Sequence, residues 1–375
     1  MPKTRNFLVA ALILSVAAFG QSSANLQPER WTAEAANNWY AKQPWPVGSN
    51  YLPSNAINEL DMWQAATFSP KRIDKELGWA QSIGMNTMRV FLQDQLWQQD
   101  HAGFMRRIDQ FLGIAAKHHI KPIFVLFDSC WDPMPHLGKQ HKPTPGVHNS
   151  GWVQSPGAKE LADENAYPKL QQYVEGVVGA FSNDDRILAW DVWNEPDNGN
   201  RGSYAKLDPA NKKELVLALL PHVFAWARNA KPAQPLTSGI WHENPAEPTN
   251  LSPMAKQQLD LSDVISFHTY EDAAAFEAEV KWLQSYYRPL ICTEYMARPK
   301  NSTFETILPI AKKYKVAAIN WGFVAGKSQT YLPWDSWQKP YVNGRVPQVW
   351  FHDVFRADGK PYLPAETEFI RKITE

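Results

Sequence analysis

The segment Ile187–Pro196 carries the first residues whose spacing points to chemistry. Its sequence, ILAWDVWNEP, reads as a short strand whose alternate side chains face opposite sides of a sheet. This alternation predicts an outward set, Leu188, Trp190 and Val192, and an inward set, Asp191, Trp193 and Glu195. Glu195 then lies at the carboxyl end of the strand. A salt-bridged or helix-capping surface glutamate is the alternative, but it leaves an inward aspartate in an apolar strand unexplained.

A second carboxylate ends the segment Pro289–Tyr295, PLICTEY. The same alternation predicts that Leu290, Cys292 and Glu294 face inward. Enough chain separates the two glutamates for three strand–helix units, so their side chains would converge across the mouth of a closed barrel. Two facing carboxylates in different surroundings can divide the roles of acid and of base or nucleophile.

Polar and aromatic side chains at the ends of other predicted strands would complete such a site. Arg89 lies in the segment NTMRVF and would point inward, where its charge would keep Glu294 ionised. FHTY ends the sixth strand, and its Tyr270 could hydrogen-bond Glu294. Trp321 in the segment NWG ends the eighth strand and could form an aromatic floor against which a sugar ring stacks. Trp241 after the fifth strand is a weaker candidate for the same role.

The elements that must position these residues alternate between short apolar strands and longer amphipathic helices. Eight strands are predicted to begin near residues 47, 86, 121, 187, 235, 264, 289 and 316. Helices are predicted over residues 70–83, 104–118, 170–181, 211–229, 273–286 and 303–314. This order predicts an α/β fold, a (β/α)8 TIM barrel. A doubly wound open sheet is the competitor, and the lack of a glycine-rich phosphate loop after the first strand weakens it.

Two connections are unusually long, residues 128–167 after the third strand and 322–364 after the eighth. Both follow strands, so both belong to the barrel face on which active sites are built, and we expect them to wall a substrate cleft.

Composition restricts the class of partner. The 375 residues include 38 basic and 38 acidic side chains, which argues against nucleic acid or an anionic membrane surface as the main partner. The chain also has 17 Trp, 13 Tyr and 17 Phe, and aromatic rings stack on the apolar faces of sugars. A tryptophan-rich core is the alternative explanation.

The first 24 residues resemble a cleaved signal peptide, with basic Lys3 and Arg5, an apolar run and then small residues. An uncleaved anchor is the alternative. We therefore expect one catalytic domain over residues 25–375 that is exported to the periplasm or the medium, with no membrane attachment after cleavage. Cys130 and Cys292, the only two cysteines, would lie on opposite sides of the barrel as free thiols.

The ordered set of strand-end motifs resembles the clan A glycoside hydrolases, and family 5, the cellulase and mannanase family, most of all. The motifs are Trp-Asn-Glu-Pro, His-Thr-Tyr, Thr-Glu-Tyr and Asn-Trp-Gly, at strands four, six, seven and eight. The resemblance implies Glu195 as acid/base, Glu294 as nucleophile and Asn194 as the ligand of the sugar 2-hydroxyl. It also implies that Arg89, His268, Tyr270 and Trp321 complete the site. This chain differs from many family 5 cellulases at the end of strand three, where it has Asp128-Ser129-Cys130 in place of a histidine pair or His-Asn.

The expected activity is hydrolysis of O-glycosidic bonds with retention, on plant-type β-1,4-linked mannan, xylan or glucan, by a protein that is expected to be a monomer. An exo-acting mannosidase or arabinofuranosidase is the first alternative, and a non-catalytic carbohydrate-binding protein is a remote one. No cofactor is expected. The spacing of His136, His141 and His148 does not match that of a zinc protease, so no metal site is predicted.

Overall fold

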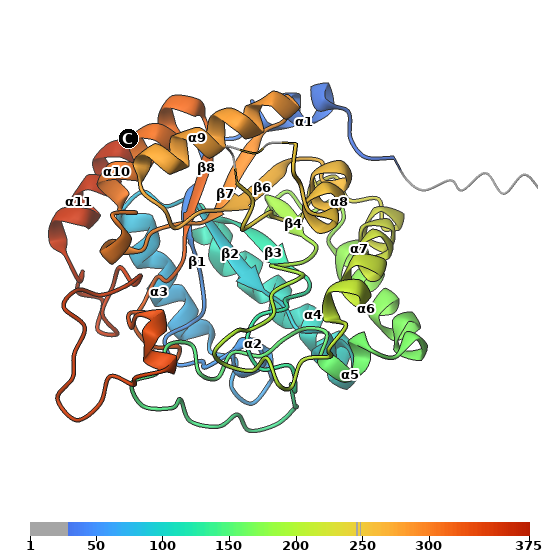
Figure 1. Ribbon diagram of the computed structural model, residues 1–375, viewed down its shortest axis with the longest axis horizontal. Coiled ribbons are helices and arrows are strands. Elements are labelled where there is room, and N and C mark those ends of the chain that lie inside the picture. The colour runs from blue at the N-terminus through green and yellow to red at the C-terminus, as the bar shows by residue number, and fades with distance from the viewer. Residues whose placement is uncertain (1–28, 245–246, 248) are drawn as a thin grey trace, which may run out of the picture.

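The computed structural model describes residues 29–244, 247 and 249–375. Parallel strands form one sheet at the centre of the molecule (Figure 1). Its eight strands follow the order β5-β4-β3-β2-β1-β8-β7-β6, and a bridge between Ile240 and Phe267 joins its two edges. The predicted (β/α)8 barrel is therefore confirmed. The strands are β1 (Val47–Asn50), β2 (Thr87–Phe91), β3 (Lys121–Val125), β4 (Ala189–Asp191), β5 (Leu236–Thr237), β6 (Ile265–His268), β7 (Leu290–Glu294) and β8 (Ala317–Asn320).

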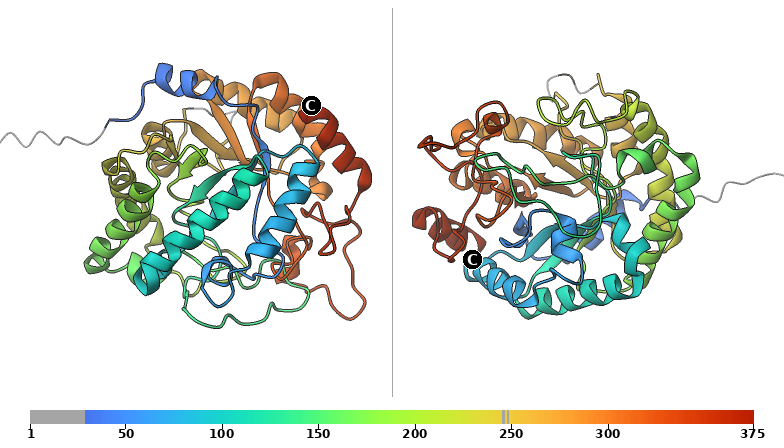
Figure 2. Two further views of the ribbon diagram at one scale, coloured as in Figure 1. Left: turned by 180° about the vertical axis from the view of Figure 1, so that it is seen from behind. Right: turned by 90° about the horizontal axis from the view of Figure 1, so that it is seen from below.

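A helix follows each strand and packs on the outside of the barrel (Figure 2). In α10, for example, Phe304, Ile307, Leu308 and Ala311 are buried, the spacing of one apolar helix face. No helix in the described ranges is long and apolar enough to cross a membrane. The eight helices are α3 (Pro70–Ser82), α4 (Asp94–Lys117), α6 (Tyr167–Ala180), α7 (Lys212–Asn229), α8 (Pro253–Leu261), α9 (Ala273–Leu283), α10 (Phe304–Tyr314) and α11 (Pro364–Thr374).

The interior of the barrel is apolar at one end and polar at the other. Helix α1 (Ala33–Tyr40) covers the amino-terminal end, where Ala36 packs with inward apolar residues such as Ile123 and Ile291. Near the carboxyl ends of the strands the inward side chains are instead Asn50, Arg89 and Asp191, joined by hydrogen bonds. The polar chemistry of the fold is therefore concentrated at the carboxyl ends of the strands.

The prediction that Leu290 and Cys292 face inward was wrong, although Glu294 does face inward. Both residues join the core between the sheet and the helices, whereas Ile291 lies inside the barrel. Phe267 pairs with Cys292 but His268 pairs with Glu294, so Thr293 is an extra residue on β7. This β-bulge resets the alternation and turns Glu294 inward.

Trp193 was also predicted to face inward, and it does not. Its ring packs on Phe127, which contacts Tyr173 of α6, and its Nε1 donates to Ser129 Oγ at 2.9 Å. Strand β4 ends at Asp191, so strand alternation no longer governs residues 192–195.

Long segments follow β3 and β8, as predicted, and a third long segment follows β4, which the sequence pattern did not reveal. The first two are joined by backbone and side-chain hydrogen bonds, including Asn149 N to Ser328 O at 2.7 Å. The β3 segment includes α5 (Ala158–Leu161), and the β1 segment includes α2 (Glu59–Trp63). Cys130 and Cys292 are buried and free, as predicted. The predicted leader, residues 1–24, lies outside the described residues.

Candidate active site

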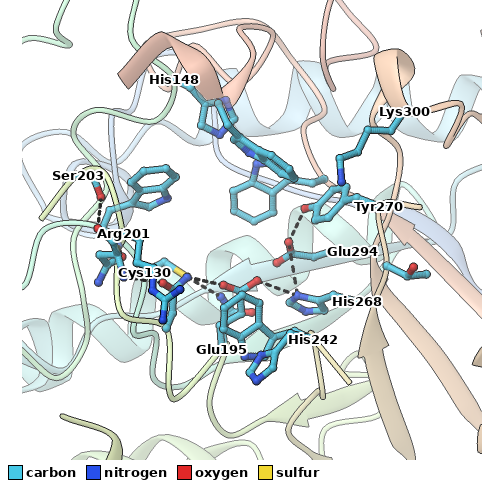
Figure 3. A pocket seen from close by; sticks show the side chains of 18 of the residues that line it. Cys130, His148, Glu195, Arg201, Ser203, His242, His268, Tyr270, Glu294 and Lys300 are labelled. Atoms are coloured by element: carbon cyan, nitrogen blue, oxygen red, sulfur yellow. Dashed lines mark hydrogen bonds and ion pairs between the residues drawn. The ribbon is translucent and has the colours of Figure 1, made fainter. Parts of the chain in front are cut away.

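Glu195 and Glu294 face each other at the carboxyl-terminal mouth of the barrel (Figure 3). Glu294 is the last residue of β7, and Glu195 lies four residues beyond β4. One oxygen of each carboxylate and one nitrogen of His268 all lie within 4.8 Å of one another. The two glutamates predicted from the sequence are therefore brought together.

Glu294 is held by a cation and a phenol. Arg89 Nη1 donates to its Oε1 at 3.0 Å, and the Tyr270 hydroxyl donates to its Oε2 at 2.5 Å. Both contacts favour the ionised carboxylate.

Arg89 is fully buried and connects four strand ends. Besides Glu294, its guanidinium donates to Asp191 Oδ2 at 2.7 and 3.0 Å, to Asn194 Oδ1 at 2.7 Å and to Asn50 Oδ1 at 3.0 Å. Because one planar group makes all these bonds, the position of Glu294 is tied to those of Asn194 and Asp191.

Among the described residues, no lysine or arginine donates a hydrogen bond to Glu195. Asn198 Nδ2 donates to its Oε2 at 2.7 Å, the Cys130 thiol donates to the same oxygen at 3.2 Å, and His268 Nδ1 lies 3.1 Å from Oε1. The backbone of Glu195 has φ +41°, in the left-handed region that side chains other than glycine seldom adopt. Such strain is typical of functional positions.

The two carboxyls differ in the charge that they face. Burial raises the pKa of Glu195, whereas the hydrogen bonds from Asn198 and Cys130 and the more distant charge of Arg89 act to lower it. Burial and the charge of Glu195 raise the pKa of Glu294, whereas His268, Arg89 and the Tyr270 hydroxyl act to lower it. Of the two carboxyls, Glu294 is the one that accepts a hydrogen bond directly from the Arg89 cation, so it is the better anion and Glu195 the better proton carrier.

His268 lies between the two glutamates as a neutral ring. Burial lowers its pKa to about 4, and its Nδ1 is 3.1 Å from Glu195 and 3.6 Å from Glu294. A neutral imidazole bridges the carboxylates without neutralising either.

Asn194 is fixed at both ends of its amide. Its Oδ1 accepts from Arg89, and its Nδ2 donates to Asp128 Oδ1 at 2.9 Å. Asp128 also accepts from Trp152 Nε1 at 2.6 Å, and Trp152 packs against the ring of Trp321. Asp128-Ser129-Cys130, the segment just after β3, thus supports both Asn194 and Glu195.

These side chains open into a cavity of about 880 Å³, which is within the range of small-molecule sites. Its lining includes Glu195, Glu294, Asn194, His268, Tyr270, Trp321 and Trp241, so seven of the eight predicted site residues border it. Arg89 lies behind them, beneath Glu294. Trp241 belongs to the wall, where its Nε1 donates to Asp197 Oδ1 at 2.9 Å.

Three aromatic rings from three different segments meet beside this cavity, and two of them, Trp131 and Trp337, line it. Trp131 after β3 stacks on Trp337 after β8, with centroids 5.1 Å apart and planes 11° apart. Tyr204 after β4 meets Trp337 edge-on at 5.4 Å. We call these three residues the aromatic bridge, since they join the three long segments across one side of the cavity.

Among the residues described, the close cluster of potential metal ligands is Glu195, His268 and Glu294, which is the carboxylate pair itself. His136 and His141 are exposed and bond neighbouring carbonyls, whereas His148 is buried and bonds Leu332 O at 2.8 Å. These three histidines do not come together as one ligand set within the described ranges.

Sequence reasoning missed Asn50, Asn198 and Cys130 as parts of the site. Asn50 had a usable signal, because it is a polar residue at the end of an otherwise small and apolar strand. Asn198 and Cys130 lie in loops, where no periodicity predicts which way a side chain points.

Comparison with known proteins identifies the family of this chain. A model of the family described as Cellulase (glycosyl hydrolase family 5) matches residues 66–340. No curated protein matches the chain by sequence.

Solved structures with a similar fold share little sequence with this chain. An exo-β-1,4-mannosidase from Opitutaceae bacterium strain TAV5 has TM-score 0.56 and 17% identity, with 88% of this chain and 59% of the mannosidase covered. An endo-β-1,4-mannanase from Thermotoga petrophila has TM-score 0.55 and 14% identity, with 89% and 77% covered. A family 5 protein from Streptomyces cattleya in complex with Manβ1-4GlcNAc has TM-score 0.54 and 11% identity, with 88% and 79% covered. This chain thus spans under two thirds of the length of the exo-mannosidase.

Proposed function

The chain belongs to glycosyl hydrolase family 5 and is an O-glycoside hydrolase, and from this premise we propose that it cleaves β-linked sugars with retention of configuration. The observation that carries the proposal is the spacing of Glu195 and Glu294, whose nearest oxygens lie within 4.8 Å. Retaining enzymes hold their carboxyl groups about 5–5.5 Å apart, whereas inverting enzymes leave roughly 6.5–9.5 Å for a water. The observed spacing favours the retaining geometry.

In the proposed first step, Glu294 attacks the anomeric carbon while Glu195 gives its proton to the leaving oxygen. The bond from the anomeric carbon to that oxygen breaks as the bond to the Glu294 carboxylate forms. In the second step Glu195 removes a proton from water, which displaces Glu294 and releases the sugar. Arg89 and Tyr270 support the nucleophile, and the proposal assigns the 2-hydroxyl of the sugar to Asn194 and the face of its ring to Trp321.

β-1,4-Mannosides are the substrate class that we propose first. Several solved structures of similar fold carry mannanase or mannosidase names, and one contains Manβ1-4GlcNAc. Xylan and glucan are the other β-1,4-linked polymers of the proposal. The experiment below distinguishes the three.

Exo action is the second candidate, and the aromatic bridge favours it. Trp131, Trp337 and Tyr204 join three loops, and Trp131 and Trp337 line the cavity. A cavity narrowed by such a bridge accepts a chain end more readily than the middle of a polymer. Exo action would release single sugars from oligosaccharides, whereas endo action would first lower the viscosity of a polymer.

The test is hydrolysis of a panel of aryl glycosides, manno-, xylo- and cello-oligosaccharides and their polymers. Glu294→Gln should lose more than about a hundredfold in turnover. Glu76→Gln is the matched control, because Glu76 is also a buried carboxylate but bonds Tyr51 and Ser54 outside the cavity. NMR of the first product formed reports retention or inversion. Near-normal turnover in Glu294→Gln, or an inverted first product, would overturn the proposal.

A further inference from the structure

We propose that Asn198 and Cys130 are positioning residues that fix which oxygen of Glu195 carries the catalytic proton. The inference rests on the proposed role of Glu195 as acid/base and extends it to two loop residues. Both donate to the same carboxylate oxygen, Oε2, at 2.7 and 3.2 Å.

A carboxylate oxygen has two lone pairs in the carboxyl plane. On Glu195 Oε2 these two positions are taken by the Asn198 amide and the Cys130 thiol. A proton on Oε2 would have to displace one of these donors. The proton is therefore carried on Oε1, the oxygen that His268 contacts.

The direction of the Asn198 amide is set by its other end. Its Oδ1 accepts from the backbone N–H of Asn200 at 2.8 Å, so its Nδ2 must point to Glu195. Asn200 is itself fixed, because its Oδ1 accepts from Trp131 N at 2.6 Å and its Nδ2 donates to Asp208 at 2.7 Å. The donor on Glu195 is thus held by a chain of hydrogen bonds that reaches the aromatic bridge.

Cys130 acts as a donor because its thiol keeps its proton. Burial, the negative charge of Asp128 and that of Glu195 raise the pKa of this thiol well above its ordinary value. Its sulfur also lies 3.5 Å from Nδ2 of both Asn194 and Asn198. A protonated thiol surrounded by amide donors has Glu195 as its acceptor.

His268 leaves room for the proton on Oε1. Its buried Nε2 has no hydrogen-bond partner among the described residues, so its N–H is best satisfied at Nδ1, toward Glu195 Oε1 at 3.1 Å. That bond takes one position on Oε1. The remaining position carries the proton that is delivered to the substrate.

Loss of either donor has two consequences. Hydrogen bonds to the ionised carboxylate lower its pKa, so their removal raises the pKa of Glu195. The proton is also no longer confined to Oε1, so proton delivery to the leaving oxygen becomes less efficient. Substrates whose leaving group needs protonation should suffer more than substrates whose leaving group departs unaided.

The experiment measures kcat/KM against pH for Asn198→Ala, Cys130→Ala and Cys130→Ser, with Cys292→Ala as the control for loss of a buried thiol outside the cavity. Each enzyme is assayed on a methylumbelliferyl and a dinitrophenyl glycoside of the best sugar. In Asn198→Ala the basic limb, which reports the acid of the free enzyme, should move up by about one pH unit. The loss of kcat/KM should be about tenfold larger for the methylumbelliferyl substrate. In Cys130→Ala the basic limb and the difference in kcat/KM between the two substrates should change in the same direction but by less. In Cys130→Ser both should return to the wild-type values.

An unchanged basic limb, together with equal losses on both leaving groups, would overturn the inference. If Asn198→Ala does not fold by thermal melting, the Cys130→Ala and Cys130→Ser pair gives the same test. A wild-type enzyme that turns over no glycoside would instead overturn the proposed function, so the two failures are distinguishable.

Discussion

Replacement of Arg89 by methionine should raise the pKa of Glu294 and narrow the pH range of activity. Arg89 Nη1 donates to Glu294 Oε1 at 3.0 Å, and the guanidinium is fully buried. A hydrogen bond to a charged group contributes about 1.5–3 kcal/mol, and one pKa unit corresponds to about 1.4 kcal/mol. The loss of this bond should therefore raise the pKa of Glu294 by about 1–2 units.

The sign follows from the state in which Glu294 reacts. The nucleophile must be ionised, so kcat/KM falls as the pH drops below the pKa of Glu294. A raised pKa moves this acidic limb to higher pH. The basic limb, which belongs to Glu195, moves in the same direction but by less, because Arg89 acts on Glu195 only through its charge and bonds Glu294 directly. The bell-shaped plot of kcat/KM against pH therefore becomes narrower on its acidic side.

The variant should still fold, with a measurable loss of stability. Asp191 and Glu294 both lose their cation, and breaking a buried ion pair costs about 3–5 kcal/mol. Domains have about 5–15 kcal/mol of unfolding free energy, so a folded fraction suitable for kinetics should remain.

The assay is kcat/KM of an aryl glycoside from pH 4 to 9, with urea unfolding of the same preparations. Arg228→Met is the matched control, because Arg228 forms a buried pair with Asp263 at 2.9 Å near the amino-terminal end of the barrel. It should lose stability and keep its pH profile. An acidic limb that does not move in Arg89→Met would refute the electrostatic reasoning, even if activity fell.

Three further predictions follow from single contacts. Tyr270→Phe should also move the acidic limb upward, by about one unit or less, because one neutral donor to Glu294 is lost; an unchanged limb would argue against the 2.5 Å bond. Glu195→Gly should be more stable than Glu195→Ala by about 1 kcal/mol in the free energy of unfolding, because only glycine is unstrained at φ +41°. Equal melting temperatures of the two variants would contradict this strain. Trp337→Ala should raise the rate on polymer relative to disaccharide, since it removes the ring that stacks on Trp131, and an unchanged ratio of the two rates would weaken the exo proposal.

The barrel and the site residues that lie on or next to strands could be predicted, because the sequence pattern shows where the strands are. Glu294 ends β7, Tyr270 lies two residues after β6, and Arg89 lies in the middle of β2. Parallel strands bring their carboxyl ends to one face whatever the loops do. Alternation correctly turned Arg89 inward, because β2 is regular over its five residues.

Alternation was unreliable where a strand bends or stops. The inward Glu294 was predicted for an incomplete reason, since the extra residue Thr293 shifts the pattern and Leu290 and Cys292 face outward. No local feature of LICTE marks the bulge, which depends on pairing with β6. Trp193 was misplaced because β4 ends two residues before it.

The loop contribution to the site could not be predicted from local sequence. The Asn198 amide points to Glu195 because Asn200 is held in place by two other residues. Trp131 comes from the segment after β3, and Asp208 lies eight residues further along the segment after β4. Such contacts follow from the packing of three loops on one another, which residue spacing does not report.

The aromatic bridge also has an optical consequence. Two indoles stacked at 5.1 Å couple their electronic transitions, so their near-ultraviolet circular dichroism differs from that of two separate rings. Trp131 and Trp337 belong to different loops, so this coupled signal exists only while those loops are in contact. The difference spectrum between the wild type and Trp337→Phe isolates this signal from the other tryptophans. The protein thus carries its own unlabelled reporter of loop separation, readable in solution while a sugar enters or leaves.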